Sequence, residues 1–368
     1  MQSLIWARSR NVISTAGRNL TKPEEPEFPT FSTRVGFLPS LRYGRNDTLF
    51  STLQFYSPSL VDNNGENYNA PVSFFTFSPG FPMSIFRIVF VLAIFCAAPL
   101  FAQPEHDILA TGSGRVVIFT PDFSVRWEAP AGNISEAKML PNGNILFADG
   151  RVVEVAPDKT QTVIYQPNSK EGSFTCSRLP NGNTLIGENS SGKVMEIAPD
   201  GSVAFSLQTK FVTDDQHHRM RYVRKLENGN YLVCHSGDHL VREYTPGGDT
   251  VWEQKVPNIA FCALRLENGN TLISSLDQIT EFTKDGKTVW EFKKSDLPDL
   301  SIRNMTGFHK RKNGNLLIGC YAAYDAEGRG VGIFEITPEK KLVWAYHKPT
   351  DGRKVDQSMM GVEMLGDK

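Results

Sequence analysis

A short repeated motif constrains the fold of this chain more than any other feature. Asn-Gly-Asn occurs five times, at intervals of 39 to 47 residues, and an apolar strand-like segment follows each copy, as in Asn144-Ile-Leu-Phe. An Asn-Gly pair between two such segments is typical of a tight β-hairpin, for which we expect a type I′ turn with positive φ at both residues. A repeat of this period indicates an array of one supersecondary unit. The copies begin at Asn142, Asn181, Asn228, Asn268 and Asn313.

A second turn motif, centred on Pro-Asp or a variant of it, follows each Asn-Gly-Asn copy, as in Val153-Glu-Val-Ala-Pro-Asp. Proline fixes φ at the first turn position, and Asp and Gly suit the positions after it, so this motif predicts a second hairpin in every unit. A glutamate precedes each of these turns. Because it recurs once per unit at one strand position, we interpret it as a structural residue and not as an acid catalyst. These glutamates are Glu154, Glu196, Glu243, Glu281 and Glu335.

A sixth unit is divided between the two ends of the repeat region. Residues 109–127 supply its last three strands, and the C-terminal segment Met360–Leu365 matches the first strand of the other units. The 266 residues from Gln103 onward then give about 44 residues per unit. The sequence therefore predicts an all-β fold, a six-bladed β-propeller of four-stranded blades over residues 107–368, closed by C-terminal strand A together with N-terminal strands B to D.

The region before the repeats has a different character. Residues 1–82 show no sustained hydrophobic period, and we expect an unstructured extension or a stretch upstream of the true translation start. Residues 83–102 resemble a signal peptide: a short basic start at Met83, an apolar run and a small-residue site before Gln103. We predict an exported protein, periplasmic or extracellular, without a membrane span after signal removal. A membrane anchor or a lipoprotein modified at Cys96 are the alternatives.

Composition narrows the function classes. Lys and Arg number 39 against 40 Asp and Glu, and no basic block is present, which argues against nucleic-acid binding. We expect a monomer. Cysteines of the repeat region stand singly in strand-like segments and are interpreted either as disulfide partners or as small buried hydrophobic residues. They are Cys176, Cys234, Cys262 and Cys320.

Two repeated segments, Leu-Pro-Asn-Gly-Asn and Asp-Gly-Lys-Thr-Val-Trp290-Glu, resemble the repeats of the PQQ-like (quinoprotein-type) β-propeller superfamily. The combination of Asn-Gly-Asn with Val-Trp-Glu is similar to arylsulfotransferase-type propellers. The resemblance covers nearly all of residues 107–368 and implies the fold. It also implies two activities as candidates, sulfuryl transfer through a histidine and dehydrogenation with PQQ and calcium.

Candidate site residues lie in the loops of one face. In a propeller the loops between strands B and C and the crossovers between blades emerge opposite the tight hairpins, around the mouth of the central channel. Four of the seven histidines fall in two such loops, interleaved with arginines. We predict His218, His235 and Arg219 as catalytic residues, because histidine transfers protons and arginine holds anions. The predicted ligand-binding residues are His217, His239, Arg221, Arg303, Tyr321, Tyr324 and His347.

No strong metal-ligand signature occurs, no metal site is predicted, and the sequence requires no cofactor. The favoured function is a propeller that binds a carbohydrate or another small polar ligand, a small molecule or glycan, at the loop face. The alternative is a histidine-dependent enzyme, either an arylsulfotransferase-like protein or a polysaccharide lyase or hydrolase. A PQQ-dependent dehydrogenase is the third candidate.

Overall fold

The structure, a computed structural model, describes residues 103–112, 114–132, 136–168, 171–347 and 358–367, together with four short strands before residue 80. The chain divides into two units, Met1–Pro99 and Leu100–Lys368. In the first unit, β1 (Ser51–Gln54) pairs with β4 (Phe74–Phe77) and β2 (Leu60–Val61) pairs with β3 (Asn67–Tyr68), which the sequence pattern did not indicate. The predicted signal peptide, residues 83–102, lies outside the described residues.

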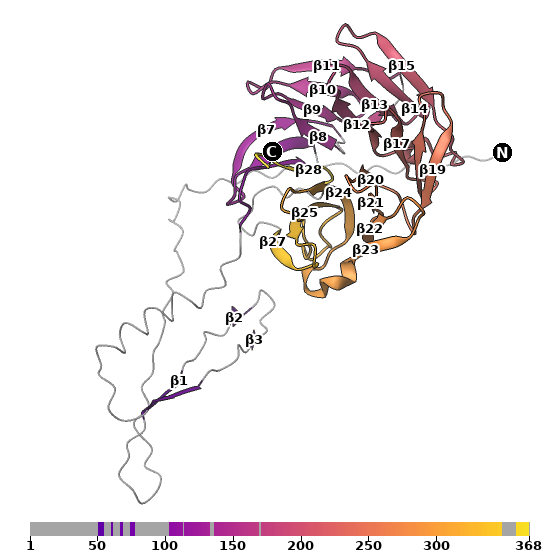
Figure 1. The fold of residues 1–368 in the computed structure, drawn as a ribbon. Coiled ribbons are helices and arrows are strands. Elements are labelled where there is room, and N and C mark those ends of the chain that lie inside the picture. Colours follow the sequence, from indigo (N-terminus) through magenta and orange to yellow (C-terminus); the bar gives the residue numbers. More distant parts are fainter. Residues whose placement is uncertain are drawn as a thin grey trace, which may run out of the picture. The chain divides into compact units, whose positions relative to one another are not determined.

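The second unit is a ring of six antiparallel four-stranded sheets, which confirms the predicted propeller (Figure 1). Blade I contains β28 (Val362–Met364), β5 (Ile108–Gly112), β6 (Arg115–Phe119) and β7 (Val125–Pro130); blade II contains β8 (Glu136–Met139), β9 (Ile145–Ala148), β10 (Val152–Val155) and β11 (Gln161–Tyr165). Blade III contains β12 (Ser173–Arg178), β13 (Thr184–Glu188), β14 (Lys193–Ile197) and β15 (Val203–Gln208); blade IV contains β16 (Val223–Lys225), β17 (Tyr231–His235), β18 (Leu240–Tyr244) and β19 (Thr250–Lys255). Blade V contains β20 (Cys262–Arg265), β21 (Thr271–Ser274), β22 (Gln278–Phe282) and β23 (Thr288–Lys293); blade VI contains β24 (Asn304–Lys310), β25 (Leu316–Tyr321), β26 (Ile333–Ile336) and β27 (Leu342–Tyr346).

The first strand of each blade faces the centre, and β8, β12 and β16 contact one another in turn, as do β20, β24 and β28. Three short 3-10 helices lie in the crossovers of the described ring: η1 (Gln216–His218), η2 (Lys294–Asp296) and η3 (Pro298–Leu300). Among the described residues, no helix is long and apolar enough to cross a membrane.

The Asn-Gly hairpins are not type I′ turns. In the first copy the Gly143 amide donates to the Leu140 carbonyl and the Leu140 amide donates to the Asn144 carbonyl, which defines a three-residue loop. Only the glycine has positive φ, +84° at Gly143, as in a type I turn followed by a G1 bulge. The Asn142 side chain accepts a hydrogen bond from the Asn144 amide at 3.0 Å, and this local bond stabilises Asn142 in a conformation with negative φ.

The repeated glutamates bind these turns. Oε1 of Glu154 accepts from the side-chain amide of Asn144 at 2.6 Å, and Glu243, Glu281 and Glu335 hold the equivalent asparagines at 2.7 Å. The same glutamate reaches a cation at the end of the next blade's inner strand. Three junctions contain this pair: Arg178 with Glu154 at 2.6 Å, Lys225 with Glu196 at 2.6 Å and Arg265 with Glu243 at 2.8 Å. The glutamates therefore tie hairpin to hairpin and blade to blade.

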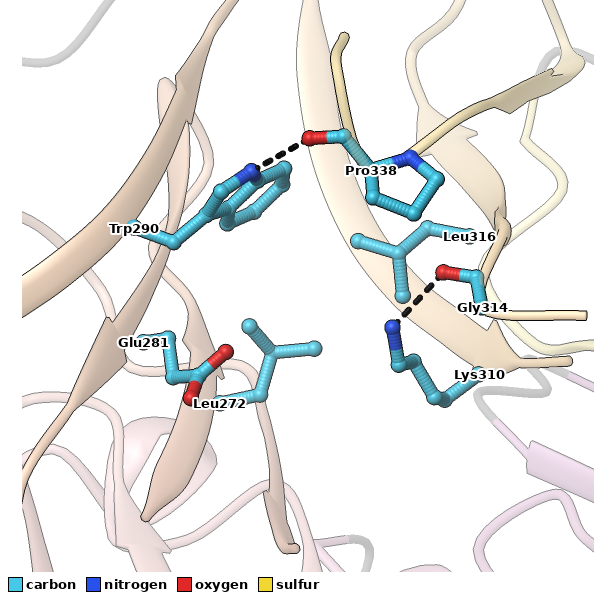
Figure 2. Close-up of a pocket in the computed structure, with 7 residues that line it drawn as sticks. All are labelled: Leu272, Glu281, Trp290, Lys310, Gly314, Leu316 and Pro338. Atoms are coloured by element: carbon cyan, nitrogen blue, oxygen red, sulfur yellow. Dashed lines mark hydrogen bonds between the residues drawn. The ribbon is translucent and has the colours of Figure 1, made fainter. Parts of the chain in front are cut away.

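The junction between blades V and VI lacks this ion pair. The equivalent cation there is Lys310, whose ammonium donates to the Gly314 carbonyl at 2.6 Å and not to Glu281. A small cavity of about 80 Å³ remains between the Trp290 indole, Leu316 and the Glu281 carboxylate (Figure 2). At the junction of blades IV and V, the guanidinium of Arg265 lies 5.3 Å from the ring of Trp252, in the corresponding place.

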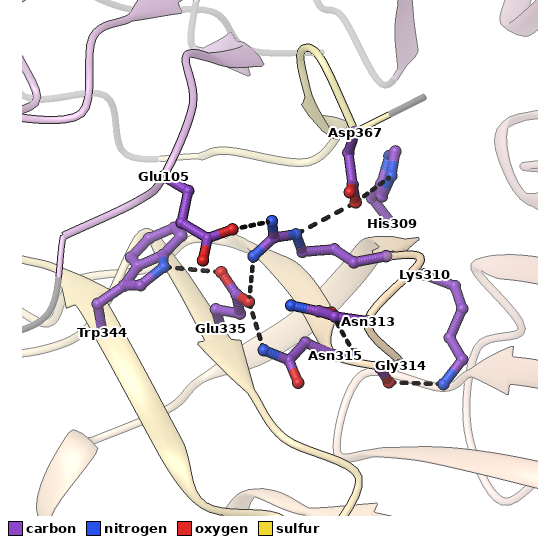
Figure 3. A network of polar contacts seen from close by, with 10 residues as sticks. Glu105, His309, Lys310, Asn313, Gly314, Asn315, Glu335, Trp344 and Asp367 are labelled. Atoms are coloured by element: carbon purple, nitrogen blue, oxygen red, sulfur yellow. Dashed lines mark hydrogen bonds and ion pairs between the residues drawn. The ribbon is translucent and has the colours of Figure 1, made fainter.

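Arg311 of blade VI fixes both ends of the ring. Its Nη1 pairs with the buried Glu335 at 2.7 Å, Nη2 with Glu105 near the start of the ring at 2.7 Å, and Nε with Asp367 near its end at 3.2 Å (Figure 3). Trp344 donates to the other oxygen of Glu335 at 2.7 Å. The split blade is therefore held both by strand pairing and by one arginine that contacts a carboxylate from each end.

An ion pair between a buried carboxylate and a partly buried guanidinium lies between the inner strands of two blades. Arg224 on β16 pairs with Glu136, whose side chain is 1% exposed on β8. Because blades II and IV are not neighbours, their inner strands meet only across the channel. Thr175 of blade III also donates to Glu136, at 2.8 Å. These polar contacts therefore join the inner strands of blades II, III and IV.

All four cysteines of the ring are buried and free, so the hydrophobic interpretation holds and the disulfide interpretation is wrong. Burial raises the pKa of Cys262 to about 11, and raises the pKa of Cys176 and Cys234 well above the usual range. These thiols behave as small core side chains.

Candidate functional site

A cavity of about 300 Å³ opens at the loop face. Its volume is at the lower end of the range for small-molecule sites. Residues from blades IV to VI and from the crossover into blade I line it. They are His218, Arg221, Ile259, Phe261, Leu276, Asn304, Tyr321 and Met360.

His218 is positioned by the crossover from blade III to blade IV. It ends η1, and its backbone carbonyl accepts from the Gly237 amide and the Ser236 hydroxyl of the loop between β17 and β18. Its Nδ1 lies 2.6 Å from Oδ2 of Asp215, the residue that caps η1. The carboxylate favours a proton on Nδ1, which leaves Nε2 as the acceptor nitrogen. No described residue makes a hydrogen bond to Nε2.

His217 stands beside this pair at the border of the cavity. Its Nδ1 lies 2.7 Å from Oε2 of Glu171, and its ring is 4.9 Å from that of His218 in an edge-on arrangement. Burial lowers the pKa of His217, and the charge of Arg221 lowers it further. His217 therefore favours the neutral form next to a permanent cation.

Arg221 is the most unusual side chain of the site. It is 7% exposed, and its guanidinium carbon lies 4.8 Å from the ring centre of Phe174 and 5.5 Å from that of Phe261. Its buried Nε has no hydrogen-bond partner, and no carboxylate of the described residues forms an ion pair with it. Burial lowers the pKa of Arg221 to about 10, so the group is charged at neutral pH. The carboxylates of Glu171 and Asp215 act on Arg221 only through longer-range electrostatics, so a bound anion could still make direct hydrogen bonds to this buried charge.

Polar and apolar groups complete the walls. Tyr321, at the end of β25, is 48% exposed, and the side-chain amide of Asn304 donates to its carbonyl at 3.0 Å. Ile259, Leu276 and Met360 supply apolar surface. The cavity thus combines one cation, one histidine and a phenol with a nonpolar floor.

Of the predicted site residues, the cavity brings together His218, Arg221 and Tyr321, with His217 at its border. His235 is fully buried inside blade IV, where its ring nitrogens face the Tyr244 hydroxyl at 2.9 Å and the Arg219 carbonyl at 3.1 Å. Its catalytic assignment is not supported by this position. Burial lowers the pKa of His235 to about 4.

The other predicted residues do not line the cavity. The Arg219 guanidinium donates to the Ser190 carbonyl and stacks on Phe211, and His239 is an exposed turn residue with φ of +54°. Arg303 donates to the Tyr324 carbonyl at 3.3 Å, and the His347 ring lies 3.0 Å from the Gly330 carbonyl. Both contacts brace the long loop between β25 and β26.

Asp215, Glu171 and the phenylalanines beside Arg221 were not predicted as site residues. Asp215 lies two residues before His217 in the sequence, so its proximity to the histidines was a usable signal. Phe174 and Phe261 come from blades III and V, and nothing in the sequence shows that they enclose an arginine of blade IV.

These features define the class of protein, a six-bladed β-propeller with a polar cavity at its loop face. No protein-family model and no curated protein sequence matches the chain. Its resemblance to the PQQ-like superfamily therefore stays a prediction.

Solved structures share the fold. A protein of unknown function from Bacteroides caccae is 23% identical, with a TM-score of 0.61 over 71% of this chain and 98% of that one. Virginiamycin B lyase from Staphylococcus aureus is 13% identical, with a TM-score of 0.46 over 67% and 85%. The extracellular domain of a putative hybrid two-component system from B. thetaiotaomicron is 15% identical, with a TM-score of 0.45 over 68% and 35%. At 23% identity, the likeness to the protein from B. caccae concerns the fold alone.

Proposed function

We propose that the propeller binds a small polar ligand with an anionic group, of the acidic carbohydrate class, in the cavity at its loop face. The observation that carries this proposal is the buried Arg221 guanidinium, which has aromatic rings beside it and no carboxylate of the described residues in direct ion-pair contact. Arginine binds carboxylates through two parallel hydrogen bonds and sulfates through the same donors. The apolar floor and the Tyr321 ring suit the faces of a sugar.

Calorimetric titration tests this function. Galacturonate oligomers, a sulfated disaccharide and the matching neutral disaccharide serve as probes for carboxylate, sulfate and uncharged ligands. We expect binding of an acidic probe and, because a hydrogen bond to a charged group contributes about 1.5–3 kcal/mol, a loss of roughly 10- to 100-fold in Arg221→Gln. Arg303→Gln is the matched control, since Arg303 lies outside the cavity. Equal affinity for neutral and acidic probes, or no effect of Arg221→Gln, contradicts the proposal.

Export belongs to the same proposal, because acidic glycans are extracellular polymers. It is supported by the apolar run after Met83 and by the small-residue site before Gln103. N-terminal sequencing of the protein recovered outside the cytoplasm is expected to start near Gln103. A mature protein that begins at Met1 would refute it.

A further inference from the structure

Besides the Arg221 cation, the cavity contains two groups that can move protons, the imidazole of His218 and the phenol of Tyr321. His218, Tyr321 and Arg221 all line it. The Asp215 carboxylate, 2.6 Å from Nδ1 of His218, fixes the ring so that Nε2 is the basic atom. A base, a proton donor and a fixed positive charge are the three groups needed to remove a proton next to a carboxylate.

We propose that the cavity cleaves uronic-acid glycans by β-elimination, with His218 as the base, Arg221 as the group that holds the carboxylate and Tyr321 as the proton donor. This inference rests on the proposed function, since it requires the uronate carboxylate to bind Arg221.

The step balances without a co-reactant. Nε2 of His218 takes the proton from C5, the carbon that bears the carboxylate, and the negative charge that develops on the carboxylate is stabilised by Arg221. The electron pair forms the C4–C5 double bond, and the C4–O bond breaks. Tyr321 gives its proton to the departing oxygen. Solvent then takes the proton from His218 and returns one to Tyr321, so the products are an alcohol end and an unsaturated uronate.

The composition of the walls favours elimination over hydrolysis. Glycoside hydrolases generally place two carboxyl groups on either side of the bond that they cleave. The residues that line this cavity include no Asp or Glu, and Asp215 reaches it only through His218. Asp215 is therefore a positioning residue, whereas His218 contacts the substrate.

Ultraviolet absorbance tests the reaction directly, because the unsaturated uronate is conjugated and its saturated substrate is not. The full chain is incubated with polygalacturonate and with glucuronan, and the products are weighed by mass spectrometry. We expect fragments lighter by one water than hydrolysis products. In His218→Gln, turnover falls at least 100-fold while Arg221-dependent binding in the titration persists, since general base catalysis contributes about 10²- to 10⁴-fold.

Two further variants separate the roles. Asp215→Asn is expected to lower kcat more than it raises KM, because Asp215 contacts His218 directly and acts on Arg221 only through longer-range electrostatics. His239→Gln, an exposed loop histidine outside the cavity, is the matched control. Uronate binding that depends on Arg221 but gives no unsaturated product, or turnover that survives in His218→Gln, overturns the elimination while the proposed binding function stands. Absence of any uronate binding overturns both.

Discussion

The junction between blades V and VI offers a quantitative test of what holds the ring together. Lys310 donates to a carbonyl and leaves Glu281 without a cation, and a cavity of about 80 Å³ separates them. In the preceding junction Arg265 fills the same space, with its side chain 21% exposed and that of its partner Glu243 7% exposed. Lys310→Arg should therefore place a guanidinium between Trp290 and Glu281.

The expected gain follows from the contacts that Arg265 makes. A hydrogen bond to a charged group contributes about 1.5–3 kcal/mol, and a cation over an indole about 0.5–1 kcal/mol. The lost bond from the Lys310 ammonium to the Gly314 carbonyl also involves a charged group, so it offsets most of the first contribution, and solvent screening reduces what remains. We expect a net increase of about 0.5–1 kcal/mol in the free energy of unfolding, close to the contribution of the cation over the indole.

Thermal and urea unfolding, followed by tryptophan fluorescence, measure this change. At about 2–4 °C per kcal/mol for a domain of this size, Tm should rise by roughly 1–4 °C. Arg265→Lys is the reverse experiment and should lower stability by a similar amount. Lys312→Arg, at an exposed position two residues further, is the control. The reasoning fails if Lys310→Arg leaves Tm unchanged while Arg265→Lys lowers it, or if Lys312→Arg gives the same increase.

Three further perturbations test other parts of the fold. Arg311→Gln leaves the fully buried Glu335 without its cation, so it should lower the free energy of unfolding in urea by about 3–5 kcal/mol. A loss below about 1 kcal/mol would contradict the role of Arg311 in closing the ring. His235 has a pKa of about 4 in the folded chain and an ordinary value of 6.5. Between these pH values the unfolded chain therefore binds a proton at this residue and the folded chain does not. Stability should therefore fall by up to about 1.4 kcal/mol per pH unit as pH decreases from 6.5 toward 4, and His235→Gln should remove one proton from that dependence in urea titrations at several pH values. Lys159 has φ of +74°, a strained value for a residue with a Cβ atom, at the turn position that Gly201 occupies in the next blade. In calorimetric scans Lys159→Gly should therefore raise Tm slightly and Gly201→Lys should lower it. The opposite result would contradict backbone strain at Lys159.

The blade architecture was predictable because each repeat specifies its own turns. Asn-Gly-Asn and Pro-Asp-Gly mark the two hairpins of a blade, and the aromatic residue of the outer strand recurs with them. The turn type was predicted incorrectly, since Asn-Gly alone suggests two residues with positive φ. In the structure the side chain of Asn142 bonds to the following backbone and only Gly143 adopts positive φ.

The site was only partly predictable, because contacts between blades do not follow from the sequence of one blade. His217, His218 and Arg221 were identified from their shared crossover, and the structure places them together. His235 has the same residue type and a similar sequence environment, yet β17 turns its ring into the blade and against Tyr244. The direction of a side chain at the end of a strand decides this difference, and local composition does not report it.

The closure of the ring also has a mechanical consequence. Strands β28 and β5 are antiparallel, with Met364 opposite Ile108, so both chain ends leave the pair at the same end. A force that pulls the ends apart would load the hydrogen bonds one after another, as in a zipper, and not all at once as in shear. The contacts of Arg311 to Glu105 and Asp367 lie where that unzipping begins. In a single-molecule pulling experiment the contacts of Arg311 would set the force at which blade I opens. The other five blades would unfold only after these contacts and the pairing of β28 with β5 are broken.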